Sequence, residues 1–471
     1  MKKRIQKLLA MGLVVVMAFS LAACGGKEST ETGGDDDGNK TATATPAPTK
    51  EAEVTRPAEK RIITVGTWYD HYYTSEHQTI DVNPNVTDTE LAEMQLQNMR
   101  DIEEKYNVEF KFINLTWDGT IESINTSIMA GTPDCDIYEV DLQFGIPAAL
   151  NGYALALEDF LPADSDIFTD QVVMKYLNVL GMDKNYLFKA TAVNTDAYPL
   201  AFNMEMLEEA GLENPQDLYD RGEWTWEKFR EYMIKLTKDT NGDGATDVYG
   251  YGGWWTNMLG NLMMSNGTHI AGDTTEGLSS PATIEVMEFI YNMYNVDKVA
   301  KPWNSDDWDI NTTVYTEKQI AFWPSAHWVF SQYGGEAELG FEIGVVPWPV
   351  GPSGNQETNN GYVTAGSYYI MSKGTKDPEF VYNVFYDWIN WFDGDTELRD
   401  DTEWAENMYM TERNFNYVVD MCKKEQFDIW GSLGLGDAFS MVPIMSGEKT
   451  ASQYAQEVKN IVQDALDSYF K

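Results

Sequence analysis

Residues 236–250, LTKDTNGDGATDVYG, place oxygen-bearing side chains at alternate positions of one short loop. Counted as a twelve-residue calcium-binding loop, they supply ligands at positions 1, 3, 5, 7 and 9, which are Asp239, Asn241, Asp243, the carbonyl of Ala245 and Asp247. Carboxylate and carbonyl oxygens at this spacing predict a structural Ca²⁺ site. Position 12, where a bidentate Glu is expected, is Gly250, so a regulatory site is not predicted. A metal-free turn between a helix and a strand is the alternative.

Tryptophan and tyrosine, with 15 and 26 copies, form a second group of residues that could contact a ligand. An indole is large, rigid and apolar, so the C–H face of a sugar ring can stack on it. Trp254 and Trp255 directly follow the glycine-rich run GYGG, where a ligand could approach the backbone closely. Packing of the paired rings in a hydrophobic core is the alternative.

The first cysteine of the chain follows an apolar run. A positively charged start, MKKRIQK, precedes residues 8–23, which are apolar but shorter than the roughly 20 residues of a membrane span. The run ends in small residues directly before Cys24. This segment resembles a bacterial lipoprotein signal. The resemblance implies that residues 1–23 are a signal peptide and that Cys24 becomes acylated, for example with palmitate. Secretion without an anchor is the alternative.

The composition predicts a tether before the folded body and excludes some classes of partner. Residues 24–60 are rich in Gly, Thr, Pro and charged residues, so a disordered tether is expected there. The formal charge of −42 disfavours nucleic acid as a partner, because phosphates would be repelled. An anionic membrane surface would be repelled too. The lipid on Cys24 would then be the membrane contact of an extracytoplasmic protein that is anchored to the bacterial cell membrane. Once Cys24 is acylated, Cys135 and Cys422 are the one pair that could form a disulfide.

Alternating elements along the start of the body would position the next candidate residues. Apolar spacing and β-branched runs predict, in order, a strand at 61–67, a helix at 88–106, a strand at 108–115, a helix at 121–131 and a strand at 135–141. This order predicts a parallel α/β sheet, whose ligands bind beyond the carboxyl ends of the strands. Trp68 and Tyr69, after the first strand, and Glu139 and Asp141, in or after the third, are therefore candidate ligand residues. Loop solvation or packing is the alternative.

Short motifs follow one another in order through the rest of the body. They are FNMEML at 202–207, AGL at 210–212, WTWEKF at 224–229, the acidic loop closing at 247–250, KQIAF at 318–322, IGVVP at 343–347, GSYYIMSK at 366–373 and PEF at 378–380. Together they resemble the extracellular solute-binding proteins of ATP-binding-cassette sugar importers, the maltose-binding family. KQIAF departs from the family pattern at Lys318 and Phe322, which weakens that single match.

The resemblance implies an α/β fold of two lobes, each a mostly parallel sheet flanked by helices, joined by a hinge of crossing segments. One lobe would take residues 61–197 and 366–405, and the other residues 198–365 and 406–471. The protein, expected to be a monomer, would close on an oligosaccharide and deliver it to the transmembrane subunits of an ABC permease. By the same resemblance, Trp323, Trp328 and Tyr362 join Trp68, Trp254 and Trp255 as candidates for contact with the sugar.

Catalytic motifs are missing from the sequence. It contains no Gly-x-Ser-x-Gly, no His-Glu-x-x-His and no phosphate-binding loop. Its 75 acidic residues guarantee chance carboxylate pairs, so no glycosidase pair can be recognised among them. A binding protein and not an enzyme is therefore predicted. The alternatives are a secreted carbohydrate-active hydrolase, a binding protein for peptides or other small solutes, and a surface adhesin.

Overall fold

The computed structural model describes residues 56–71, 89–168, 182–189, 197–303, 314, 317–325, 330, 340–358, 368–389, 406, 409–424 and 428–470. The chain divides into two units, residues 1–53 and 54–471, and every described residue lies in the second. Four predicted features lie outside the described residues: the signal peptide with Cys24, residues 24–55 of the tether, Trp328 and Tyr362. No helix within the described ranges is long and apolar enough to cross a membrane.

The first sheet has the strand order β2-β1-β3-β9-β4. Its strands are β1 (Arg61–Thr67), β2 (Val108–Asn114), β3 (Ile137–Val140), β4 (Leu187–Phe188) and β9 (Tyr368–Met371). β1 pairs in parallel with β2 and β3, whereas β9 runs antiparallel to β3 and β4. The carboxyl ends of the four parallel strands and the amino end of β9 therefore share one edge, which we call the first edge.

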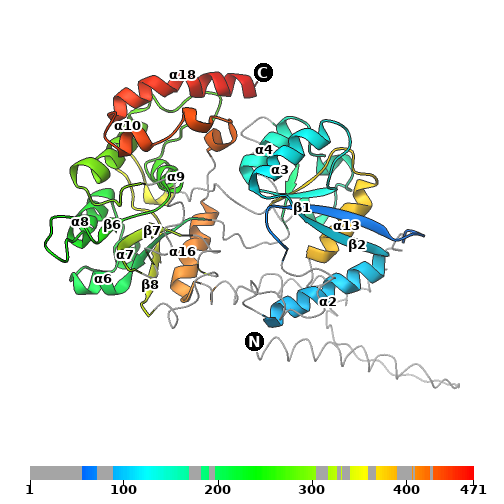
Figure 1. Cartoon of the computed structure of the whole chain (residues 1–471), viewed down its shortest axis with the longest axis horizontal. Helices are drawn as coiled ribbons and strands as arrows, with labels where there is room; N and C mark the ends of the chain where they lie inside the picture. Colours follow the sequence, from blue (N-terminus) through cyan, green and yellow to red (C-terminus); the bar gives the residue numbers. More distant parts are fainter. Residues whose placement is uncertain are drawn as a thin grey trace, which may run out of the picture. The chain divides into compact units, whose positions relative to one another are not determined.

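Helices cover both faces of the first sheet (Figure 1). α2 (Thr89–Tyr106) and α13 (Pro378–Ile389) pack on one face, where the core includes Ile63, Phe110 and Phe385. The other face carries α3 (Trp117–Ser123), the π-helix η2 (Ile124–Ile128) and α4 (Leu142–Leu150). The short turns η3 (Leu157–Asp159) and η4 (Asp166–Phe168) follow. Gly145 lets α4 approach β4 closely, because a Cβ there would lie 2.5 Å from Cδ2 of Leu187.

The second sheet has the strand order β6-β7-β5-β8. Its strands are β5 (Leu200–Asn203), β6 (Tyr249–Tyr251), β7 (Ile320–Pro324) and β8 (Ile343–Val346). β5 runs antiparallel to β7 and β8, and β6 is parallel to β7. The carboxyl ends of β6, β7 and β8 thus share an edge with the amino end of β5, which we call the second edge.

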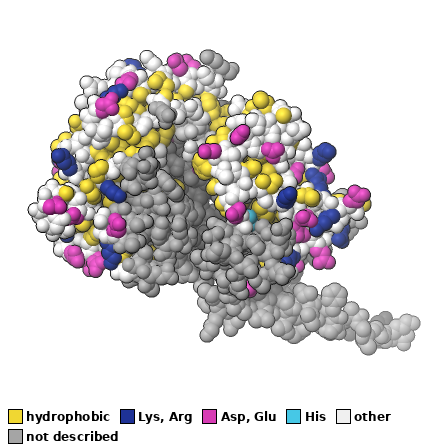
Figure 2. All heavy atoms as spheres, in the orientation of Figure 1, with side chains coloured by type: hydrophobic (Ala, Val, Ile, Leu, Met, Phe, Trp, Pro, Cys, Tyr) yellow, Lys and Arg dark blue, Asp and Glu magenta, His cyan; other side chains and the backbone are white. Residues whose placement is uncertain are grey.

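The helices of the second half pack in two groups. On the sheet, α8 contacts β6 and β7, while α7 and α16 contact β8; a further group forms around α10 with α9, α17 and α18. The elements are α6 (Met204–Glu209), α7 (Pro215–Asp220), α8 (Trp226–Leu236), α9 (Trp255–Ser265), α10 (Pro281–Tyr291), η5 (Asn292–Val296), η7 (Gln356–Thr358), α16 (Glu412–Lys423), η8 (Ile429–Ser432), η9 (Gly436–Ala438), α17 (Val442–Met445) and α18 (Ala451–Tyr469). Figure 2 shows acidic and basic side chains interspersed over the visible described surface.

The two sheets confirm the predicted α/β class with mostly parallel strands, although each sheet contains one antiparallel strand. The strands of the first sheet fall within 61–197 and 366–405 and those of the second within 198–365. The exact lobe boundaries stay a prediction. The helix predicted at 121–131 begins earlier, at Trp117, because Thr116 caps it. Cys135 and Cys422 are both buried, and neither forms a disulfide within the described part of the chain.

Candidate functional site

Two predicted ligand residues meet at the first edge. Tyr69 follows β1, and its hydroxyl donates a hydrogen bond of 2.9 Å to Oε2 of Glu139 in β3. The hydroxyl of Thr67 donates to the carbonyl of Tyr69 at 2.6 Å, which fixes the turn that presents the ring. Glu139 is 3% exposed, so its carboxylate is held in place at the edge of the sheet. The parallel pairing of β1 with β3 brings the two residues together, as the strand order predicts.

Asp141 has a structural role at this edge. It is the N-cap of α4, where its side chain accepts a hydrogen bond of 2.6 Å from the backbone N–H of Gln143. The carboxyl group is 1% exposed. Burial raises the pKa of Asp141 to about 7, and the hydrogen bond from Gln143 offsets this only in part. Near neutral pH this carboxyl is therefore partly protonated.

A string of aromatic rings runs along the first edge. Trp68 lies edge-on to Trp117, with ring centroids 5.5 Å apart, and Trp117 lies edge-on to Phe144 at 4.4 Å. Trp68 also contacts Tyr69 at 6.0 Å. The rings come from three places, after β1, at the start of α3 and on α4. They form a partly open apolar surface next to the polar pair of Tyr69 and Glu139.

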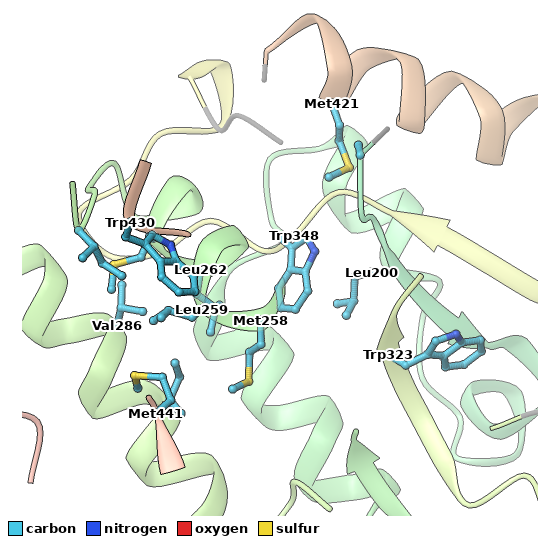
Figure 3. Close-up of a cluster of buried hydrophobic side chains, with 14 of the residues drawn as sticks. Leu200, Met258, Leu259, Leu262, Val286, Trp323, Trp348, Met421, Trp430 and Met441 are labelled. Carbon is cyan, nitrogen blue, oxygen red and sulfur yellow. The ribbon is translucent and has the colours of Figure 1, made fainter. Parts of the chain in front are cut away.

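The second edge carries a matching aromatic group. Trp254 and Trp255 follow β6, and the half-buried Trp255, the first residue of α9, stacks on Trp430 of η8 with centroids 5.9 Å apart. Figure 3 shows Trp430 beside Leu259, Leu262 and Val286, which hold its ring in the core. The N–H of Trp430 is buried and has no hydrogen-bond partner among the described residues.

Two more polar groups at the second edge are buried without a partner in the described part of the chain. They are the amide nitrogen of Asn257, in the first turn of α9, and the hydroxyl of Ser325, directly after β7. Buried polar groups are nearly always hydrogen-bonded. Asn257 and Ser325 are 3% and 0% exposed, so both groups lie beneath the surface of the second edge.

Trp323 lies differently from its neighbours. It sits within β7 at 1% exposure and belongs to the hydrophobic core, as does Trp348, whose N–H donates to the carbonyl of Tyr198 at 2.8 Å. Figure 3 shows Trp323 and Trp348 on either side of Leu200. Contact of Trp323 with a ligand stays a prediction.

A buried carboxylate anchors η8 next to α9. Asp428 accepts hydrogen bonds from the backbone N–H groups of Ile270 and Ala271, at 2.5 and 2.8 Å, and from that of Trp430 at 3.2 Å. Burial raises the pKa of Asp428, and the charge of His269 acts against that rise. The position of the Trp430 ring is thus set by a carboxylate that the sequence analysis did not single out.

A cavity of about 320 Å³ lies between the two halves of the body. Ile121, Ile124 and Phe144 border it on one side, and segment 431–434 with Tyr469 borders it on the other. Its polar lining consists of amides, a hydroxyl and a phenol, namely Asn125, Gln143, Asn151, Ser432 and Tyr469. None of the described lining residues carries a charge. The volume is at the lower end of the ~300–1,000 Å³ of small-molecule sites.

The cavity borders the first aromatic group and the turn that carries Trp430 of the second. Phe144 belongs both to its lining and to the string on the first edge, while Ser432 in its lining belongs to the same turn as Trp430. The buried hydroxyl of Ser432 has no hydrogen-bond partner among the described residues. The length of the connecting chain also sets an upper limit on the separation of the two edges. The chain leaves the first edge at Lys189 and enters the second at Ala197. Because eight extended residues span at most roughly 29 Å, the Cα atoms of these two residues lie no further apart than that.

The predicted calcium loop is exposed and organised by its own backbone. Asp239 accepts hydrogen bonds from the N–H groups of Gly242 and Gly244, at 2.6 and 2.8 Å, which lower its pKa. The side chain and N–H of Thr240 do the same for Asp247. Within the described ranges no three His, Cys, Asp or Glu side chains are arranged to hold a metal. Because calcium loops also use amide and carbonyl oxygens, the site stays a prediction.

Several residues of this site escaped the sequence analysis. Trp117 follows β2 almost directly, so the rule that singled out Trp68 would have found it as well. Phe144 and Gln143 follow β3 in the same way. Trp430 has no such local signal, because its partner Trp255 is far away in sequence.

The sequence matches one known family of proteins. Residues 83–396 match the sequence profile of the family described as bacterial extracellular solute-binding protein. No curated protein matches the sequence.

The fold is similar to several solved structures. An ABC substrate-binding protein from Listeria monocytogenes in complex with cycloalternan has a TM-score of 0.63 and 15% identity over 87% of this chain and 100% of that one. The maltose/maltodextrin-binding domain MalE from Bdellovibrio bacteriovorus bound to maltotriose has a TM-score of 0.60 and 14% identity over 86% and 100%. UgpB from Mycobacterium tuberculosis in complex with glycerophosphocholine has a TM-score of 0.59 and 16% identity over 88% and 100%. These similarities confirm the predicted two-lobed architecture.

Proposed function

Because the chain belongs to the bacterial extracellular solute-binding proteins, we propose that it captures a neutral oligosaccharide between its two lobes and delivers it to the permease of an ABC importer. The family consists of binding proteins, so the chain is not an enzyme, as its sequence predicts.

The observation that carries the proposal is the chemistry of the cavity. Its lining combines amides and hydroxyl groups with apolar surface and contains no charged side chain among the described residues. The chain as a whole carries 108 charged residues, so a neutral lining is informative. A charged solute would lose its hydration there without gaining a countercharge. A neutral sugar offers hydroxyls to the amides and C–H faces to the apolar groups.

The aromatic rings on both edges support the same class of solute. Trp68 and Trp117 lie on the first edge and Trp255 on the second, all only partly buried. Rings on opposite lobes could hold a sugar ring from two sides once the lobes close. Two of the three similar structures contain sugars, cycloalternan and maltotriose, whereas the third contains glycerophosphocholine.

A thermal-shift screen of the purified protein tests this proposal. The panel contains maltotriose, mannotriose, cycloalternan and glycerophosphocholine. At least one oligosaccharide should raise the melting temperature, because a ligand at 100 times its Kd adds ~2.7 kcal/mol to the free energy of unfolding. Stabilisation by glycerophosphocholine alone would contradict the choice of a neutral sugar.

The lipid anchor is proposed from the sequence around Cys24. The acyl chains on its sulfur would hold the body near the permease on the outer side of the membrane. Cys24→Ser should release the protein from the membrane fraction into the medium and abolish its labelling by a palmitate analogue. Cys422→Ser, which removes a thiol in α16, is the control and should stay in the membrane fraction. Membrane retention of Cys24→Ser would contradict the anchor.

A further inference from the structure

Trp117 presents a partly exposed indole beside the cavity. Its side chain is 42% exposed, which makes it one of the few large apolar residues on the described surface. Ile121, one turn further along α3, is 37% exposed and lines the cavity. Trp117 therefore lies one helical turn from the lining residue Ile121 and contacts a second lining residue, Phe144.

The indole of Trp117 is nevertheless held firmly. Trp68 meets it at an interplanar angle of 79° and Phe144 at 63°, so edge-on contacts fix the ring on two sides. An exposed ring without a binding role would not need two ring contacts that fix its orientation. Two neighbouring rings that orient a third one while leaving part of it exposed form a rigid platform for another ring.

The backbone directly before Trp117 is strained. Thr116 has φ 64° and ψ 168°, a conformation that a β-branched residue rarely adopts. Hydrogen bonds hold it there. Its N–H donates to Oδ1 of Asn114 at 3.0 Å, its hydroxyl accepts from the N–H of Gly119 at 3.3 Å, and its carbonyl accepts from the N–H of Thr120 at 3.0 Å. Strain that the surrounding structure over-determines is typical of functional sites.

The same turn is tied to the loop after β1. The side-chain amide of Asn114 donates to Oδ1 of Asp70 at 3.0 Å. The segment that carries Trp117 and the segment that carries Trp68 and Tyr69 are thus joined by a hydrogen bond as well as by ring contacts. A displacement of the Thr116 turn would move both aromatic residues.

We infer that Trp117 is a solute-contacting residue of the first lobe, on whose exposed surface one sugar ring stacks, and that Thr116 is the positioning residue that holds this indole beside the cavity. The inference rests on the proposed function and deepens it. It adds a stacking position and a strained turn that sets the orientation of the platform.

Residue-resolved oxidation of the unmodified protein tests the contact. Hydroxyl-radical footprinting with peptide mass spectrometry measures the oxidation rate at each tryptophan, with and without saturating sugar from the panel of maltotriose, mannotriose and cycloalternan. Oxidation of Trp117 should slow several-fold when sugar is bound. Protection at Trp255 without protection at Trp117 would overturn this inference alone. Protection at neither residue by any sugar would overturn the proposed function and this inference with it.

Variants separate contact from positioning. By calorimetry with the sugar that binds, Trp117→Ala should weaken affinity about tenfold, with Trp117→Phe in between. Met129→Ala, which removes an exposed side chain just beyond η2, is the matched control and should bind normally. Thr116→Gly should fold but bind more weakly, because the turn before Trp117 loses the side-chain cap that holds it, and Thr116→Ser should restore binding. Unaltered affinity in Trp117→Ala would overturn the contact, and unaltered affinity in Thr116→Gly would overturn the positioning role.

Discussion

The hydroxyl of Tyr69 donates a hydrogen bond to the carboxylate of Glu139, and the bond joins the ends of β1 and β3. Both residues stand where a parallel α/β sheet presents ligand contacts. Glu139 is 3% exposed, so the loss of this donor would leave a buried carboxylate less well solvated. The pair therefore links the shape of the first edge to the stability of the lobe.

We predict that Tyr69→Phe lowers the free energy of unfolding by about 1–3 kcal/mol, because it removes one hydrogen bond to a buried charge. Urea denaturation measures the change. A double-mutant cycle with Glu139→Gln should show a coupling energy of at least ~0.5 kcal/mol. Strict additivity of the two single changes would mean that the hydrogen bond contributes nothing.

Trp255→Ala should weaken sugar binding while the protein stays folded, because the half-buried Trp255 contacts Trp430 at the rim of the core. Trp323→Ala provides the contrast. Its side chain is 1% exposed, so its removal should cost about 3–5 kcal/mol of stability. Calorimetry and urea denaturation of both variants separate the two effects. Normal affinity in Trp255→Ala would exclude this ring from the site.

The difference between these two tryptophans shows where sequence reasoning reaches its limit. In the sequence, each lies in or just after a segment that reads as a strand, so the local pattern does not distinguish them. Trp255 ends up at the rim because Gly252 and Gly253 interrupt the chain after β6 and α9 then begins. Trp323 instead lies inside β7, between strands on both sides. Only the pairing of β7 with β5 and β6, which involves residues far apart in sequence, decides that.

Other parts of the site were within reach of the sequence. The strand-helix order predicts that Trp68, Tyr69 and Glu139 gather at one edge, and they do. The cavity could not be predicted in this way. It needs α4 from the first lobe and segment 431–434 near the end of the chain, and no local pattern indicates that these two segments meet.

Asp141 should make stability depend on pH. Burial raises its pKa from 3.8 to about 7, so the folded state holds this proton more tightly than the unfolded state does. The contribution is fully present below pH ~4 and is lost as the pH rises to about 7, by up to ~4 kcal/mol, since one pKa unit corresponds to ~1.4 kcal/mol. Asp141→Asn keeps a good N-cap without the titration. The stability of the variant relative to the unaltered protein should therefore rise between pH 4 and 7. A constant difference would contradict the assignment.

Calcium in the loop of Asp239–Asp247 can be counted directly. Protein purified without chelator should contain one calcium ion per chain by inductively coupled plasma spectrometry, and EDTA should lower its melting temperature. Asp239→Asn should reduce the calcium content, because it removes the ligand at position 1. Asp273→Asn, in another exposed acidic turn, is the control. A content of zero in the unaltered protein would end the proposal.

Native mass spectrometry of the purified protein mixed with each neutral oligosaccharide tests the central claim most directly, because one spectrum reports both binding and the fate of the ligand. The account predicts a one-to-one complex whose mass excess equals that of the intact sugar, and the same sugar on release. A mass excess that matches a shortened sugar, or no complex with any oligosaccharide while a charged solute forms one, would contradict it.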